Sequence, residues 1–94
     1  MHIIKKKAIE DFVARFPESR SPFFGWYRVL LKASPRNLME LREYCRSADQ
    51  VGELYVFNIG GNNYRLIAAI HFNRQKLFIR HVLTHDEYDR GGWK

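Results

Sequence analysis

Three consecutive β-type runs lie in the C-terminal half of the chain, and they restrict the possible folds more than any other feature. The runs are 54–59, 64–72 and 76–83, and they are separated by Gly-Gly-Asn-Asn at 60–63 and Asn-Arg-Gln at 73–75. Glycine and asparagine accept the positive φ angles that tight hairpin turns require. The sequence therefore predicts an antiparallel three-stranded meander.

The N-terminal half shows helical spacing of its apolar residues instead. Pro17 ends the first helical pattern, Ser21 is the expected N-cap of the second, and Asn37 is the expected N-cap of a short third helix. The predicted elements are an edge strand at 2–4 and helices at 5–16, 21–33 and 38–45. The predicted fold class is α+β, with N-terminal helices packed on a mainly antiparallel three- to four-stranded sheet and a short C-terminal helical turn.

The meander sorts its side chains into two faces, because strand side chains alternate and pairing preserves that alternation. One face is nearly all apolar and needs helices to cover it, and the other is partly open. The apolar set is Tyr55, Phe57, Ile59, Tyr64, Leu66, Ala68, Ile70, Phe72, Leu77, Ile79, His81 and Leu83. The open set is Val56, Asn58, Arg65, Ile67, Ala69, His71, Phe78, Arg80 and Val82. We therefore expect His81 to be a core histidine, unless a β-bulge exchanges part of the assignment.

Length and composition indicate one domain, 1–94, in a reducing compartment. A chain of 94 residues encloses one core, and 46% hydrophobic residues are enough to build it without covalent cross-links. Cys45 is the single cysteine, which excludes an internal disulfide and argues against a cysteine metal site. No apolar run approaches the roughly 18 to 20 residues of a membrane span, and no secretory signal is present. We expect a cytoplasmic protein without membrane contact.

The charge distribution favours an anionic partner. Sixteen Lys and Arg residues against ten Asp and Glu residues give a net charge of +6, and no acidic residue lies between Glu53 and Asp86. Such a surface attracts polyanions, which in the cytoplasm are nucleic acids and acidic protein segments. A generic solvated surface explains the charge alone equally well, so the charge does not decide the function.

The segment Ile79-Arg-His-Val-Leu-Thr-His-Asp-Glu-Tyr-Asp89 joins the last strand to a short turn. Thr84 is the expected N-cap, with Asp86 and Glu87 in the first turn, where they suit the helix dipole. His85 and Tyr88 are then presented by this turn. Pattern alone leaves two interpretations open: His85 as a surface residue with Tyr88 as packing, or both as catalytic groups.

Arg65 and Arg80 on the open face, with His85 and Tyr88 nearby, suit a phosphodiester substrate. Arginine binds phosphate through a planar fork and keeps its charge. Histidine titrates near neutrality, and tyrosine can donate a proton or stack on a base. The alternative is that the two arginines form weak surface ion pairs with Asp86 or Asp89.

The open face carries no cluster of carboxylates or histidines that would hold a metal. Any nuclease activity is therefore expected to need no metal or other cofactor, which restricts its substrate to RNA, because the 2′-hydroxyl of RNA is an internal nucleophile. Full activity in chelator would support this hypothesis. Further phosphate contacts are expected from basic residues at the first helix start and at the second hairpin, although both sets also suit plain solvated positions. These residues are Lys5, Lys6, His71, Arg74 and Lys76.

Residues 55–89 resemble the HigB toxin family of the RelE/ParE-like superfamily. The matching motifs are Tyr-Val-Phe-Asn-Ile-Gly-Gly-Asn at 55–62, Tyr-Arg-Leu at 64–66, Ile-Arg at 79–80 and Thr-His-x-Glu-Tyr-Asp at 84–89. The resemblance implies a RelE-like fold and an mRNA endonuclease of a type II toxin–antitoxin system, which inhibits translation by cutting messages on the ribosome. It also implies a cognate antitoxin, expected to be a HigA-like helix-turn-helix protein that alone contacts operator DNA.

The same resemblance assigns functional roles to Arg65, as the arginine of the middle strand, and to Tyr88, as the tyrosine near the C-terminus. Arg80 corresponds to a second basic residue, which in some relatives lies nearer the end of the strand, and His85 is assigned by position and chemistry together. The sequence lacks the lysine-rich cluster of some RelE proteins, so the general base stays open. Two other interpretations remain: a ParE-like toxin that inhibits gyrase by binding, and a basic RNA-binding module without activity.

Overall fold

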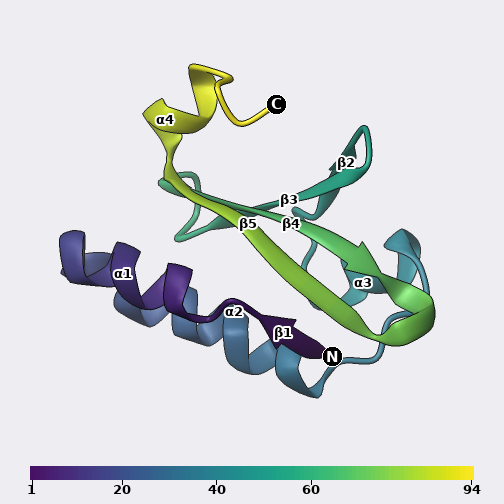
Figure 1. Ribbon diagram of the computed structural model, residues 1–94. Helices are drawn as coiled ribbons and strands as arrows, with labels where there is room; N and C mark the ends of the chain where they lie inside the picture. The colour runs from purple at the N-terminus through teal and green to yellow at the C-terminus, as the bar shows by residue number, and fades with distance from the viewer.

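The structure, a computed structural model, describes residues 1–94 and has an α+β architecture built on one sheet (Figure 1). Helices α1 and α2 lie on one side of the sheet, whereas α4 and the C-terminal segment lie at the other. The elements are β1 (His2–Ile4), α1 (Lys7–Arg15), η1 (Pro17–Ser19), α2 (Arg20–Lys32), α3 (Leu38–Tyr44), β2 (Asp49–Val51), β3 (Leu54–Ile59), β4 (Tyr64–His71), η2 (Phe72–Arg74), β5 (Lys76–Thr84) and α4 (His85–Asp89).

The sheet has five strands in the order β1-β5-β4-β3-β2. The predicted meander forms β3, β4 and β5, which pair antiparallel, and the expected edge strand β1 pairs parallel to β5. Strand β2 was not predicted, because its residues 49–51 are mostly polar and all exposed. It forms a short hairpin with β3 through Gly52, whose φ of 62° only glycine adopts readily.

Two of the three predicted N-caps are found where the sequence places them. The side chain of Asn37 accepts a hydrogen bond from the backbone N–H of Glu40 at 2.9 Å, and Thr84 caps α4. Ser21 is not a cap, because α2 already begins at Arg20. Pro17 starts a single 3₁₀ turn that runs directly into α2, so the chain never leaves helical geometry at Ser21.

The main core lies between the sheet and helices α1, α2 and α3. It contains 17 buried residues, and its sheet side is the predicted apolar face almost throughout. Phe57 is fully buried, with its ring centroid 5.2 Å from that of Trp26 in α2. Phe12, Phe23 and Tyr64 form a second aromatic group in edge and tilted contacts. Such ring pairs add to the stability gained by burial alone.

A β-bulge in β5 overturns the predicted position of His81. Ile67 pairs with His81 and Ala68 pairs with Ile79, so Arg80 has no partner on β4. One extra residue reverses the alternation beyond it. His81 and Leu83 therefore lie on the open face, and Val82 packs against the main core in their place. His81 is half-buried there and is not a core histidine.

No helix is both long enough and apolar enough to cross a membrane.

Cys45, the residue that ends α3, packs against the main core, and its burial raises the pKa of the thiol to about 11. The thiol is therefore held in its neutral form near neutral pH.

Candidate active site

Helix α4 stands on the open face, and local hydrogen bonds fix its start. The hydroxyl of Thr84 accepts from the backbone N–H of Glu87 at 3.2 Å, and the Glu87 carboxylate accepts from the N–H of Thr84 at 2.9 Å. This is a complete capping box. The N–H of His85 donates to the carbonyl of Asn63 at 2.9 Å, which ties α4 to the β3–β4 turn. A five-residue helix is unstable alone, so these contacts are needed to form it.

Arg65 is a buried cation with no acidic partner. It is 6% exposed and takes part in none of the ion pairs of the structure. Its guanidinium donates to the Tyr64 carbonyl at 2.9 Å, the Asn62 carbonyl at 3.2 Å and the Asn62 side-chain oxygen at 2.6 Å. Neutral acceptors satisfy these N–H groups but leave the positive charge in place. The charge can therefore attract an anion at this point of the surface.

Tyr88 connects Arg65 to the C-terminal segment. The guanidinium carbon of Arg65 lies 5.3 Å from the centroid of the Tyr88 ring, within the range of a cation–π contact. Trp93 stacks on Tyr88 with 5.1 Å between ring centroids and 14° between planes. The sequence motifs indicate Tyr88 but not Trp93, which lies beyond them.

His85 pairs with Asp89 one helical turn later. The His85 Nδ1 and an Asp89 carboxylate oxygen are 2.9 Å apart. With Nδ1–H donating to the carboxylate, the free Nε2 is an acceptor, so this contact selects the tautomer and orients the ring. Both side chains are substantially exposed. Asp89 was expected, as one alternative, to pair with Arg65 or Arg80, and neither pair forms. The i,i+4 spacing of His85 and Asp89 was the signal that could have identified Asp89 as the partner of His85.

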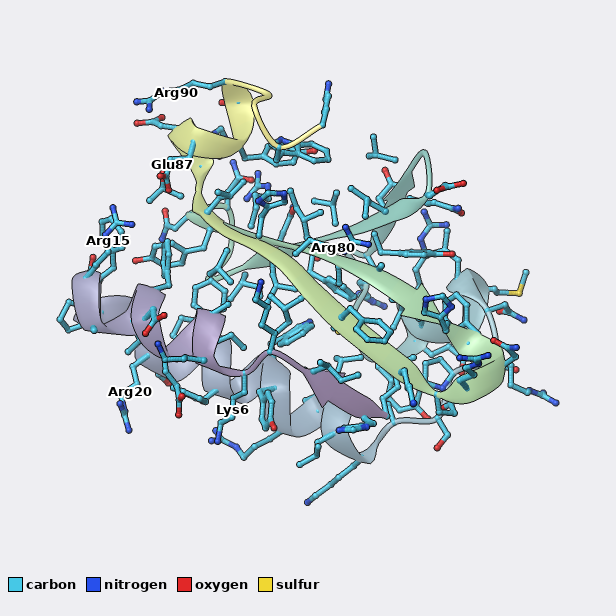
Figure 2. The ribbon with its side chains drawn as sticks, in the orientation of Figure 1. Lys6, Arg15, Arg20, Arg80, Glu87 and Arg90 are labelled. Carbon is cyan, nitrogen blue, oxygen red and sulfur yellow. The ribbon has the colours of Figure 1, made fainter.

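Arg80 lies apart from the Arg65–Tyr88 contact. Leu83 pairs with Arg65, and Arg80 is three positions earlier on β5, which corresponds to roughly 10 Å along the strand. Its side chain is exposed at the bulge. Figure 2 shows it near the middle of β5, away from Glu87 on α4 and from Arg90 at the end of that helix.

The other expected phosphate contacts divide into two groups. His71 pairs directly with Lys76 across β4 and β5, and Arg74 lies in the turn between them. Lys6 is on the helical side of the molecule, where its ammonium lies 5.1 Å from the centroid of the Tyr27 ring (Figure 2). Lys5 precedes it. The structure therefore groups the three hairpin residues but does not bring Lys5 and Lys6 to the same face.

The surface around α4 is open. A hollow of about 300 Å³ beside the helix is lined by His81, Leu83, Glu87, Arg90, Gly92 and Trp93. The largest hollow, of about 720 Å³, lies among Lys6 and residues of α1, η1 and α2, and neither hollow is lined by Arg65, Arg80, His85 or Tyr88. No group of three or more His, Cys, Asp or Glu side chains is arranged to hold a metal ion. A shallow site beside unpaired cations suits a polymer that runs across the surface.

Comparison with known proteins identifies the family. Residues 19–91 match the family model described as HigB toxin, RelE-like toxic component of a toxin–antitoxin system. The mRNA interferase toxin HigB of Escherichia coli (strain K12) is 35% identical over 92 residues, which cover 95% of this chain and 88% of that protein. The mRNA interferase HigB of E. coli O6:H1 is 32% identical over 93 residues, 96% of this chain and 90% of its own length. The chain therefore belongs to the HigB family of RelE-like toxins from toxin–antitoxin systems.

Proposed function

We propose that this protein is an mRNA interferase, an endoribonuclease that cuts messages and so inhibits translation. The observation that supports it best is the arrangement on the open face: an unpaired, buried Arg65 contacts Tyr88, and the same short helix carries the His85–Asp89 pair. The names of the relatives agree with this activity. They do not favour the ParE-like alternative of gyrase inhibition by binding.

The proposed reaction is attack by the 2′-hydroxyl of the RNA on the adjacent phosphorus. His85 Nε2 takes the proton from this hydroxyl, because Nδ1 is committed to Asp89. The new bond joins the 2′-oxygen to phosphorus, the bond from phosphorus to the 5′-oxygen breaks, and the 5′-oxygen is protonated by the Tyr88 phenol. The products are a 2′,3′-cyclic phosphate and a 5′-hydroxyl.

The two arginines serve at different places along the RNA. Arg65, next to Tyr88, stabilises the charge that grows on the phosphoryl oxygens. Arg80, further along β5, binds a neighbouring phosphate, and His71, Arg74 and Lys76 continue this basic path at the hairpin. Lys5 and Lys6 lie on the other side, and we assign them to contacts with ribosomal RNA. No metal ion or other cofactor is needed in this scheme.

Ribosome dependence follows from the shallow form of the site. The protein supplies few groups that position a nucleotide, so the ribosome would supply the geometry that brings the 2′-hydroxyl in line with the leaving oxygen. We further propose that the protein acts in the cytoplasm.

Family membership implies a cognate antitoxin. We propose that it is a HigA-like helix-turn-helix protein, and that contact with operator DNA occurs only through it. The +6 charge of the toxin supports binding to an acidic segment of such a partner.

The test uses messages that carry one 2′-deoxynucleotide at the mapped cleavage position on programmed ribosomes. Wild-type protein should cut the all-RNA message and leave a 2′,3′-cyclic phosphate, and the single deoxynucleotide should abolish the cut at that position only. Cleavage of the deoxy message, or products with a 5′-phosphate, would contradict 2′-hydroxyl attack. Intact messages on ribosomes arrested by the toxin would contradict the nuclease function itself.

A further inference from the structure

The residues after α4 fold back and bury one large side chain on the open face. Gly91 follows α4 with φ of 74°, a conformation that reverses the chain at a helix end and that glycine adopts without strain. Trp93 is 7% exposed, although no residue of α4 itself is buried. It packs on Val56 and Ile67 of the sheet. Figure 1 shows the C-terminal segment turning back from α4 toward the strands.

Two contacts join Trp93 to the candidate catalytic helix. Its indole ring stacks on the Tyr88 ring, and its Nε1–H donates to the Tyr88 carbonyl at 3.0 Å. The ring of Tyr88 also faces the Arg65 guanidinium. Trp93 thus holds Tyr88 in two ways, through its ring and through its main chain.

We propose that Trp93 is a positioning residue that fixes α4, and with it Tyr88 and His85, over the open face. The inference rests on the proposed function, because it assumes that these two side chains act on RNA. Trp93 itself touches no reacting atom in this scheme. It is the one buried residue of the segment 85–94. The other contacts of α4 include hydrogen bonds at its first turn, the cation–π contact of Tyr88 and the packing of the half-buried Tyr88 against the cluster of Val56, Ile67 and Trp93.

This position predicts a selective kinetic effect. The residues assigned to binding the message beside the site, Arg80, His71, Arg74 and Lys76, lie on β4, β5 and their connecting turn, which do not depend on Trp93 for their strand pairing. Loss of Trp93 should therefore leave RNA affinity nearly unchanged and slow the chemical step. A shift of about 1 Å in a catalytic group costs on the order of 100-fold in rate.

The experiment compares Trp93→Ala, Trp93→Phe and Trp26→Phe in the full chain, measured on mRNA-programmed ribosomes. Trp93→Ala should lower kcat roughly 10- to 100-fold with KM within about twofold of wild type. Trp93→Phe keeps a ring on Tyr88 but loses the Nε1 donor, and should recover most of that loss. Trp26→Phe is the matched control, because this indole lies in the main core, far from α4, and its Nε1 has no hydrogen-bond partner to lose.

A second measurement does not depend on activity. Backbone amides of Glu87, Arg90 and Gly91 donate within α4 and its C-terminal turn, and their hydrogen exchange reports whether the helix is held. They should exchange faster in Trp93→Ala, while amides of β3 to β5 keep wild-type rates. An unchanged kcat in Trp93→Ala would overturn the proposal, and so would unchanged exchange in α4. If the wild-type protein cuts no message, the proposed function fails, and the exchange result still decides whether Trp93 holds the helix.

Discussion

The two faces of the sheet are stabilised in different ways. One is closed by α1, α2 and α3 around a core of 17 buried residues, whereas the other has a cluster of three, Val56, Ile67 and Trp93, under a five-residue helix. The first face supplies the apolar burial on which folding depends. The second depends on a capping box, a buried arginine and one tryptophan. Stability and catalysis should therefore respond to substitutions on opposite faces.

The largest effect should come from the core face, and a phenylalanine on each face makes the comparison direct. Phe57→Ala removes a fully buried ring and should cost about 3–5 kcal/mol of unfolding free energy. Phe78 is half-buried on the open face of the sheet, so Phe78→Ala should lower the unfolding free energy by less than half as much. Urea denaturation, monitored by circular dichroism, measures the unfolding free energy of both variants. Equal losses for the two variants would contradict the assignment of one face as the stabilising one.

On the open face the same comparison predicts lost activity with a retained fold. His85→Ala should lower message cleavage by at least about 100-fold, which is the usual contribution of a general base. Asp89→Asn should lower it by less, because the imidazole remains and only its orientation and tautomer are weakened. The melting temperature should change little, since His85 is only half-buried and Asp89 is exposed.

Asp86→Asn is the matched control in the same helix, because this carboxylate takes part in none of the ion pairs of the structure. It should cleave as wild type does. A fully active His85→Ala protein would exclude His85 as the base and leave Tyr88 as the remaining proton-transfer group on α4.

The smallest effect concerns Cys45 under the core face. Its pKa is raised by burial to about 11, so the thiol binds a proton in the folded state at pH values where it loses it in the unfolded chain. Stability from this group is present below pH 9 and falls as pH rises toward 11. Alkylation by iodoacetamide at pH 8 should be slow in buffer and fast in urea. Rapid alkylation of the folded protein would show that the thiol is not held in the core.

Much of the fold could be predicted from local patterns. Helical spacing, proline and asparagine placed the helices, and two Gly/Asn-rich turns placed the meander, because these signals act over a few residues. The Thr84 cap was predictable for the same reason, since Thr84 and Glu87 are three residues apart. Strand β2 was missed because it is polar and held by pairing with β3 rather than by burial.

The candidate site was predicted less completely. Arg65 contacts Tyr88 on α4, which also carries His85, whereas Lys6 lies on the helical side and His81 lies outside the core. Asp89 was noted only as an ion-pair partner for arginines. Its pairing with His85 follows from their i,i+4 spacing on α4. Whether Arg65 or Arg80 also reaches it depends on where α4 stands, and a local pattern does not contain that information.

By itself, the sequence determined the order of helices and strands, the cap that starts α4 and the set of cationic side chains, since these follow from spacing and residue type. The tertiary structure alone decided the bulge at Arg80, the contact of Arg65 with Tyr88 and the stacking of Trp93 on Tyr88. These features join residues that are distant in the chain. Their energies depend on how two strands, a turn and a returning C-terminal segment pack together, and that packing exists only in the folded protein.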